Sequence, residues 1–469
     1  MRHIVAACAA LLCVATSATA EPGPLPPSAD VALGRSLFKE LIEIDSTHAH
    51  GTTGAAHALE ARFLAAGFAR EDLTFIAPDE HPQSGNLIVR YRGTQHAPAV
   101  LFLGHLDVVA ARREDWSVDP FQLIEKDGWF YGRGTDDMKD GDAALAAALI
   151  RLRREHWMPD HDVIAAFTAD EEAGGDANGP AYLLRTHREL IDAAVAYNLD
   201  GGGGGLDHGH RTFYEVGTSE KTYVTYTLET TGPGGHGSIP GPDNPIYRLA
   251  QALGRIEAHH FPVVTTLTTR AYFKAMAALA QGTARADLLG VAQTTPDASA
   301  AERLSESPFM NAQLHTTCVA TLITGGHAEN ALPQRAKATV QCRMMPGDDA
   351  GAVLNTLRAV VAEPKITVTL DAEPIVSPES VPVAAVMDRV TAVIHALWPD
   401  VPLVPSMATG FSDDRQTRNA GIPSYDVSGL WMESGENRAH GRDERIGARE
   451  FDESLEYVYR LVREMGISR

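Results

Sequence analysis

Short apolar runs that end in acidic residues or histidine constrain this chain more than any other feature of its sequence. Three such runs are typical of buried β-strands: 99–103, 163–167 and 194–199. Helical patterns alternate with them, most strongly at 143–154, and this alternation predicts an α/β fold with a mostly parallel sheet and flanking helices. Ligands of such sheets bind beyond the carboxyl ends of the strands. Because His105, Glu171 and Asp200 follow the runs closely, we expect a functional site at that edge.

The length of the chain and a change of pattern predict two domains. A chain of 469 residues is too long for one compact core. After Gly217 the pattern becomes β-α-β-β-α-β, which is typical of a compact α+β unit, and the α/β pattern resumes near Ala384. We therefore predict a discontinuous α/β domain at 21–216 and 375–469. The inserted α+β domain covers 217–374 and contains an extra, mostly helical segment at about 258–310.

The first twenty residues are typical of a secretory signal peptide. An apolar run at 4–14 follows Arg2, and Ala18-Thr19-Ala20 matches the cleavage pattern. The run is shorter than the roughly 20 residues that span a bilayer. We expect an exported protein that is periplasmic or secreted after cleavage near Ala20.

The charge of the chain excludes two classes of partner. The formal net charge is -21 and the pI is about 5.3, whereas nucleic-acid phosphates need a basic surface. The same charge disfavours docking on anionic lipid, and no further apolar run of spanning length follows. We expect neither a nucleic-acid partner nor a membrane partner.

Two cysteines, Cys318 and Cys342, remain once the signal peptide is removed. Both lie in runs that are typical of strands, and a hairpin centred near Asn330 would place them opposite each other. Export permits a disulfide. Two buried free thiols fit the pattern equally well.

Histidines and carboxylates gather in motifs whose residue types suit a zinc site. His105 and Asp107 point to the same side of a strand end, so Asp107 or a neighbour would hold the second ring nitrogen of a zinc-binding His105. Alone, the pair is more typical of a buried histidine beside a loop-capping acid. Asp136 and Asp137 repel each other, which favours a solvated loop or a nearby cation. Asp137 is our candidate for a carboxylate that bridges two metals.

The downstream motifs extend this set. Asp170, Glu171 and Glu172 follow an apolar strand, which is hard to explain without a cation unless the loop is exposed. One glutamate could bind metal while the other takes a proton from water that zinc has acidified. Asp200 fits a ligand or a turn cap. His440 lies in a polar loop, where a surface histidine is the usual alternative.

Together the motifs resemble the co-catalytic zinc exopeptidases, which include aminoacylases, carboxypeptidases of the G type and succinyl-diaminopimelate desuccinylase. The resemblance covers nearly the whole mature chain and is close from His105 to Glu444. It implies a zinc-exopeptidase-like catalytic domain that holds two zinc ions per subunit, with cobalt or manganese as alternatives. It also implies that Asp107 orients a ligand and that Glu171 is the general base. The implied zinc ligands are His105, Asp137, Glu172, Asp200 and His440.

The inserted domain resembles the family's lid, through which members dimerise. The Gly-rich motif at 232–237 implies that His236 stabilises the oxyanion of the reaction. Asn330 and Arg343 resemble the lid pair that binds substrate, and a guanidinium suits a carboxylate bidentately. Gly410 matches a substrate-contacting turn. The glycine run after Asp200 and the 258–310 insertion are most similar to the carboxypeptidase S branch.

The resemblance implies a hydrolase that cleaves an amide bond next to a free α-carboxylate, as a carboxypeptidase or dipeptidase does. An aminoacylase that acts on N-acyl amino acids is the alternative. An inactive zinc-binding family member is a third interpretation, against which the intact ligand set argues. A homodimer through the lid is also implied, with His236 acting in its own or in the partner's site.

Overall fold

The computed structural model describes residues 23–468, so the predicted signal peptide at 1–20 lies outside the described residues. These residues form two compact units. The smaller unit contains Ser219–Glu379 and Met407–Phe411, and the larger contains 23–218, Ser380–Ser406 and 412–468. Met407–Phe411 therefore clusters with the smaller unit, although the sequence analysis assigned 375–469 to the other domain. The domain boundaries derived from the sequence stay a prediction.

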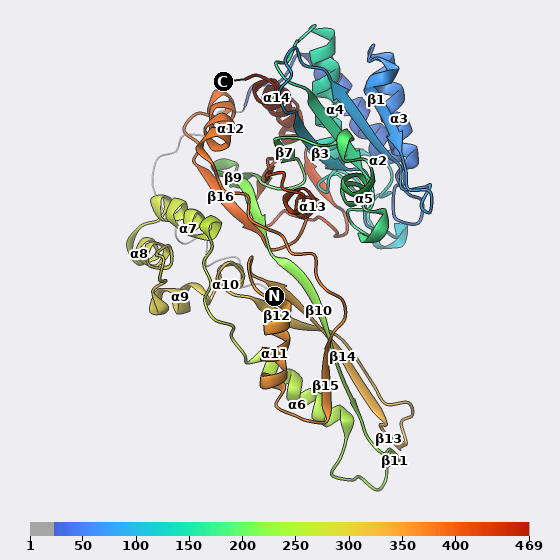
Figure 1. Cartoon of the computed structure of the whole chain (residues 1–469), viewed down its shortest axis with the longest axis vertical. Coiled ribbons are helices and arrows are strands. Elements are labelled where there is room, and N and C mark those ends of the chain that lie inside the picture. The colour runs from blue at the N-terminus through green and yellow to red at the C-terminus, as the bar shows by residue number, and fades with distance from the viewer. Residues whose placement is uncertain (1–22, 469) are drawn as a thin grey trace. The chain divides into compact units, whose positions relative to one another are not determined.

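A large mixed sheet lies at the centre of the larger unit (Figure 1). Its central strands β6, β3, β7 and β17 are parallel, while β1, β2 and β9 pair antiparallel towards the edges. The predicted α/β class is thus confirmed, with the parallel strands at the centre of the sheet. In sheet order the strands are β1 (Leu73–Ile76), β2 (Asn86–Tyr91), β6 (Val163–Thr168), β3 (Val100–His105), β7 (Val195–Asn198), β17 (Ser424–Asp426), β9 (His210–Glu220), β8 (Gly203–Asp207) and β18 (Trp431–Glu433), with β16 (Leu403–Ala408) paired to β9.

Helices cover both faces of this sheet, which is why its central strands read as continuous apolar runs. Phe102 of β3 packs into a core with Leu145 and Phe451, whereas its neighbour Leu101 packs on the other face with Leu183. Both faces are therefore buried. The helices of this unit are α2 (Ser28–Glu43), α3 (Thr53–Ala65), α4 (Lys139–Arg154), α5 (Gly179–Thr186), α12 (Ala384–Leu397), α13 (Asp414–Asn419) and α14 (Ala448–Met465), with short 3-10 turns at Arg70–Asp72, Arg113–Asp115, Gly175–Ala177 and Arg188–Leu190.

A small antiparallel sheet lies outside the main one and joins distant parts of the chain. It contains β4 (Ile124–Lys126), β5 (Trp129–Tyr131) and β19 (Arg445–Gly447), in the order β19-β5-β4. The pairing of β19 with β5 brings the loop before residue 445 next to the turn that follows residue 131.

The smaller unit is built on a four-stranded antiparallel sheet with α6 (Pro245–Glu257) and α11 (Ala350–Val361) packed in its core. The strand order is β12 (Thr317–Gly325), β14 (Arg335–Met344), β10 (Thr222–Thr231) and β15 (Ile366–Leu370), and a two-stranded ribbon joins β11 (Gly235–His236) to β13 (Ala331–Leu332). The predicted extra segment is helical: α7 (Leu267–Leu279), α8 (Gly282–Val291), α9 (Ala298–Leu304) and α10 (Pro308–Leu314).

Cys318 and Cys342 form a disulfide across β12 and β14. They are direct partners in the antiparallel register, as the predicted hairpin required. Of the two alternatives left open by the sequence, the structure has the disulfide.

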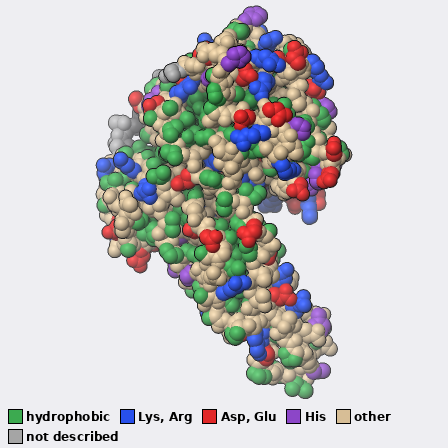
Figure 2. Space-filling view, viewed as in Figure 1, with side chains coloured by type: hydrophobic (Ala, Val, Ile, Leu, Met, Phe, Trp, Pro, Cys, Tyr) green, Lys and Arg blue, Asp and Glu red, His purple; other side chains and the backbone are tan. Residues whose placement is uncertain are grey.

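Surface charge and helix composition are the two features relevant to nucleic-acid and membrane partners. On the face that Figure 2 shows, acidic and basic side chains are interspersed. Within residues 23–468, no helix is long and apolar enough to cross a membrane.

Candidate metal centre

Three neighbouring strands bring the predicted ligands to one edge of the main sheet. His105 ends β3, Glu171 and Glu172 follow β6, and Asp200 follows β7. Since β6, β3 and β7 are adjacent and parallel, their carboxyl ends meet at this edge. The topology of the sheet thus brings the predicted ligands to the edge where ligands of such sheets bind.

The tautomer of His105 leaves one ring nitrogen for a ligand. Its Nδ1–H donates to the backbone carbonyl of Asp107 at 3.0 Å. In the neutral ring Nε2 then carries a lone pair, and this buried atom has no hydrogen-bond partner anywhere in the described chain. It nevertheless lies 3.1 Å from Asp137 Oδ1 and 3.6 Å from Asp200 Oδ1. A lone pair that faces carboxylates suits a shared cation.

Asp137 lies between the two histidines. Its Oδ1 faces His105, and its Oδ2 lies 3.0 Å from His440 Nε2. His440 Nε2 is also 2.9 Å from Glu172 Oε2. The geometry divides the predicted ligands into two groups that share Asp137: His105 with Asp200, and His440 with Glu172.

The residues fit zinc in donor type and spacing. Ligand atoms of His105, Asp137 and Glu172 all lie within 4.8 Å of one another. Ligands about 2.0–2.2 Å from a tetrahedral zinc ion are roughly 3.3 Å apart, close to the separations seen here. Three carboxylates and two imidazoles also offer the negative charge that two divalent ions need.

The short distances between imidazoles and carboxylates, together with burial, shift the pKa values in this cluster. Hydrogen bonds to Asp137 and Glu172 raise the pKa of His440 to about 10. Burial raises the pKa of Asp200 to about 6, although the His105 imidazole opposes this. In the absence of metal, imidazole protons occupy the positive positions between the carboxylates.

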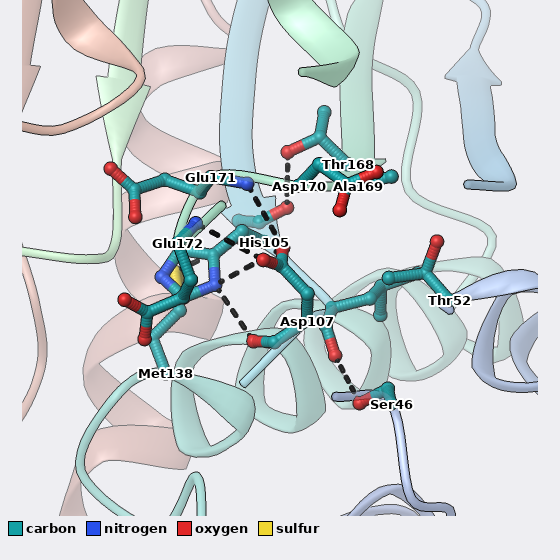
Figure 3. Close-up of polar contacts among 12 residues, drawn as sticks. Ser46, Thr52, His105, Asp107, Met138, Thr168, Ala169, Asp170, Glu171 and Glu172 are labelled. Atoms are coloured by element: carbon teal, nitrogen blue, oxygen red, sulfur yellow. Dashed lines mark hydrogen bonds and ion pairs between the residues drawn. The ribbon is translucent and has the colours of Figure 1, made fainter. Parts of the chain in front are cut away.

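Asp107 contacts both His105 and the loop that carries Glu171 and Glu172 (Figure 3). Its backbone carbonyl holds His105, while its carboxylate accepts the backbone N–H of Glu171 at 3.1 Å and that of Glu172 at 3.0 Å. The carboxylate lies 3.8 Å from His105 Nδ1. The sequence predicted that Asp107 or a neighbour would hold the second ring nitrogen. The structure assigns that contact to its carbonyl and gives its carboxylate the loop that carries both glutamates.

The Glu171 carboxyl group belongs to neither of the two groups of predicted ligands. It is 5% exposed, and burial raises its pKa well above the usual value. Its buried Oε1 has no hydrogen-bond partner among residues 23–468. A buried carboxylate with a free oxygen and a raised pKa has the properties of a general base.

Glu444 was missed by the sequence analysis as a functional residue. It is fully buried, and its Oε1 accepts the backbone N–H of Asp136 at 2.8 Å and that of Asp137 at 3.2 Å. Arg133 pairs with its other oxygen and donates to the carbonyl of Gly441 at 3.0 Å. Together they fix the Asp137 turn against the His440 loop. An acid four residues after His440 was the only signal in the sequence.

The predicted lid residues all lie in the smaller unit, where they form two separate sites. His236 and Asn330 are close, because β11 pairs with β13 and the N–H of Gly237 donates to the carbonyl of Asn330 at 2.7 Å. Arg343 lies near the other end of β14, and Gly410 is exposed in Met407–Phe411. From Arg335 to Arg343 the strand rises about 27 Å, at roughly 3.4 Å per residue. Asn330 and Arg343 of one chain are therefore not adjacent, contrary to what a substrate-binding pair suggests.

The family of the chain follows from comparison with known proteins. A model of peptidase family M20/M25/M40 matches residues 101–464. The chain belongs to this family. It is thus a metal-dependent peptidase or amidohydrolase, and the resemblance inferred from the motifs is confirmed.

Relatives of this M20 protein cover most of its length. It is 26% identical over 384 residues to the N-fatty-acyl-amino acid synthase/hydrolase PM20D1 of Homo sapiens, which is 77% of this chain and 73% of that protein. It is 25% identical to the probable carboxypeptidase S-like 2 of Dictyostelium discoideum, over 81% and 74% of the two chains. Among solved structures, the M20 metallo-carboxypeptidase Sso-CP2 from Sulfolobus solfataricus superposes with a TM-score of 0.67 at 16% identity, covering 92% of this chain and 99% of that one. This last likeness establishes the fold.

Proposed function

We propose that this M20 protein is a di-zinc hydrolase that cleaves an amide bond next to a free α-carboxylate, as a carboxypeptidase or dipeptidase. One observation carries the proposal: Asp137 turns one oxygen towards His105 and the other towards His440. A carboxylate between two imidazoles, each beside a further carboxylate, is the donor set of a two-metal site.

The roles of the ligands follow from this arrangement. His105 and Asp200 would hold one ion, His440 and Glu172 the other, and Asp137 would bridge them. Cobalt or manganese could replace zinc with the same ligands. When bound, the ions supply Lewis-acid chemistry, which polarises the scissile carbonyl and acidifies water.

The residues of the chain carry out the proton transfer. Glu171 accepts the proton of the attacking water and returns it to the leaving amine. Asp107 keeps Glu171 and Glu172 in place through their backbone N–H groups. Hydrogen bonding also supports the role of His236, whose Nδ1 accepts the backbone N–H of Ser238 at 3.2 Å. The proton of a neutral His236 is therefore on Nε2, from which it can donate to an oxyanion.

A homodimer through the smaller unit is part of the proposal. Because about 27 Å of β14 separates Arg343 from the end that carries Asn330 and His236, one chain does not offer all three to a single small substrate. A second copy would supply His236 and Asn330. The edge strand β12 supports this, since it exposes Val319 (56%), Leu322 (66%) and Ile323 (60%). An apolar edge strand can pair with another chain.

Hydrolysis of N-acyl amino acids is the second candidate. It is favoured by the similarity to PM20D1 proteins, which are named N-fatty-acyl-amino acid synthase/hydrolase. The same catalytic residues would serve, and Arg343 would bind the carboxylate of the amino acid in both cases. We further propose that the protein is exported, periplasmic or secreted, on the basis of its first twenty residues.

A substrate screen tests the proposal. The mature chain with zinc is assayed against dipeptides, N-acyl amino acids of increasing acyl length, and the C-terminal amides of both. We expect hydrolysis of substrates with a free carboxylate and little of the amides. Hydrolysis of long-chain N-acyl amino acids alone would favour the second candidate. Equal rates on acids and amides, or no hydrolysis by protein with bound zinc, would contradict the proposal.

A further inference from the structure

Two aromatic rings contact the guanidinium group of Arg343. The guanidinium carbon lies 4.9 Å from the centroid of the Tyr223 ring and 5.6 Å from that of Phe411. The two rings also contact each other edge to face, with centroids 6.0 Å apart and planes at 75°. Both guanidinium distances are within the range of cation–π attraction. We call Tyr223 and Phe411 the aromatic clamp.

The clamp joins two distant segments of the chain. Tyr223 is the direct cross-strand partner of Arg343, in β10 and β14. Phe411 comes from Met407–Phe411, which clusters with the smaller unit. The position of Phe411 therefore depends on what holds this short segment against β10 and β14.

The helical insertion and Lys221 hold the segment. Gln313 of α10, 1% exposed, donates from Nε2 to the carbonyl of Met407 at 3.0 Å. The backbone N–H of Lys221 donates to the carbonyl of Ala408 at 3.0 Å. The Nζ of the same lysine, which is fully buried, donates to the carbonyls of Ala312 at 2.9 Å and His315 at 2.6 Å. Lys221 thus ties the end of α10 to the segment that carries Phe411.

We propose that Tyr223 and Phe411 are positioning residues that hold the Arg343 guanidinium ready to bind the substrate carboxylate, and that α10, the last helix of the insertion, keeps Phe411 in place through Gln313. This inference rests on the proposed carboxylate-binding role of Arg343. A guanidinium binds a carboxylate through two parallel hydrogen bonds, which require a defined orientation of its plane. Contacts from two directions reduce the side-chain freedom that binding would otherwise remove.

The test compares ring-removing variants with a conservative one. Tyr223→Leu and Phe411→Leu keep apolar volume but remove the rings, whereas Tyr223→Phe keeps the ring. For a dipeptide with a free carboxylate, each Leu variant should raise KM by about 2- to 5-fold with kcat little changed, and Tyr223→Phe should keep KM within about 2-fold. KM for the C-terminal amide of the same dipeptide should not change. Gln313→Met should raise KM for the acid in the same direction but by less, and Gln293→Met, at an exposed position just after α8, is its control.

A crystal structure makes the test independent of turnover. In the Tyr223→Leu/Phe411→Leu double variant, the Arg343 side chain should occupy more than one rotamer, whereas the wild type and Tyr223→Phe should show one. A single unchanged rotamer, or an unchanged KM for the acid, would overturn the clamp. An unchanged KM for Gln313→Met would overturn the role of the insertion. If instead Arg343→Met leaves acid and amide equally well hydrolysed, the proposed function fails at Arg343, and the rotamers still decide the clamp.

Discussion

Replacing Asp107 by asparagine tests how Glu171, the proposed proton acceptor, is positioned. The Asp107 carboxylate accepts two backbone N–H groups, the buried one of Glu171 at 3.1 Å and the part-buried one of Glu172 at 3.0 Å. Asparagine has one carbonyl oxygen, so its amide nitrogen would face one of these donors and leave it unpaired. An unsatisfied buried donor costs about 1–3 kcal/mol. Loss of a residue that orients metal ligands typically lowers metal affinity or activity by about 10- to 100-fold.

The assay separates these two effects. Unfolding of the metal-free protein in denaturant measures the cost of the unpaired N–H group. Competition for zinc with a chromogenic chelator measures the loss of metal affinity. Both are done at pH 8, because burial raises the pKa of Asp107 to about 7 and the carboxylate should be ionised. Asp79→Asn, the same change at an exposed position, is the control. If Asp107→Asn matched this control in both measurements, the role we assign to the Asp107 carboxylate would be refuted.

Two further predictions concern the smaller unit. Replacing Cys318 and Cys342 with serine should lower the free energy of unfolding by about 3 kcal/mol, because the disulfide closes a loop with a sequence separation of 24; an unchanged denaturation midpoint would contradict this. Burial lowers the pKa of Lys221 from 10.5 to about 7, so between these pH values the unfolded chain binds more protons than the folded chain. The free energy of unfolding of the wild type relative to Lys221→Met should therefore rise from pH 7 towards pH 10. A flat difference in denaturant titrations across that range would show that the pKa of Lys221 is not depressed.

The sequence could predict that the candidate ligands gather at one edge of the sheet, because this depends on local patterns. His105, Glu171 and Asp200 each follow an apolar run, and the parallel order of β6, β3 and β7 brings these run ends together. The residue types then indicated a metal. The two helices of the inserted β-α-β-β-α-β unit, α6 and α11, were also predictable from their periodicity.

Contacts between distant segments could not be predicted in this way. Glu444 supports the Asp137 turn across about 300 residues of sequence, and its local sequence shows only an acid four residues after His440. The approach of Phe411 to Arg343 is likewise a contact between distant segments. The separation of Arg343 from Asn330 depends on the length and direction of β14, which became clear only from its register with β10 and β12.

The position of His440 beside Asp137 could not be predicted either. His440 lies in a polar loop that is typical of the surface, and it is still half exposed, with 55% of its side chain accessible. The pairing of β19 with β5 is what places this loop beside Asp137. A sequence pattern reports burial and periodicity, whereas this contact depends on the pairing of two three-residue strands.

Turnover and bound metal of Glu171→Gln, measured on the same preparation, test the central claim most directly. Glutamine has nearly the same shape but cannot accept the proton of water. We predict the same two metal ions per chain as in the wild type and a kcat lower by about 10²- to 10⁴-fold. A kcat equal to that of the wild type, or loss of metal from the variant, would contradict the assignment of Glu171 as the proton acceptor beside a two-metal site.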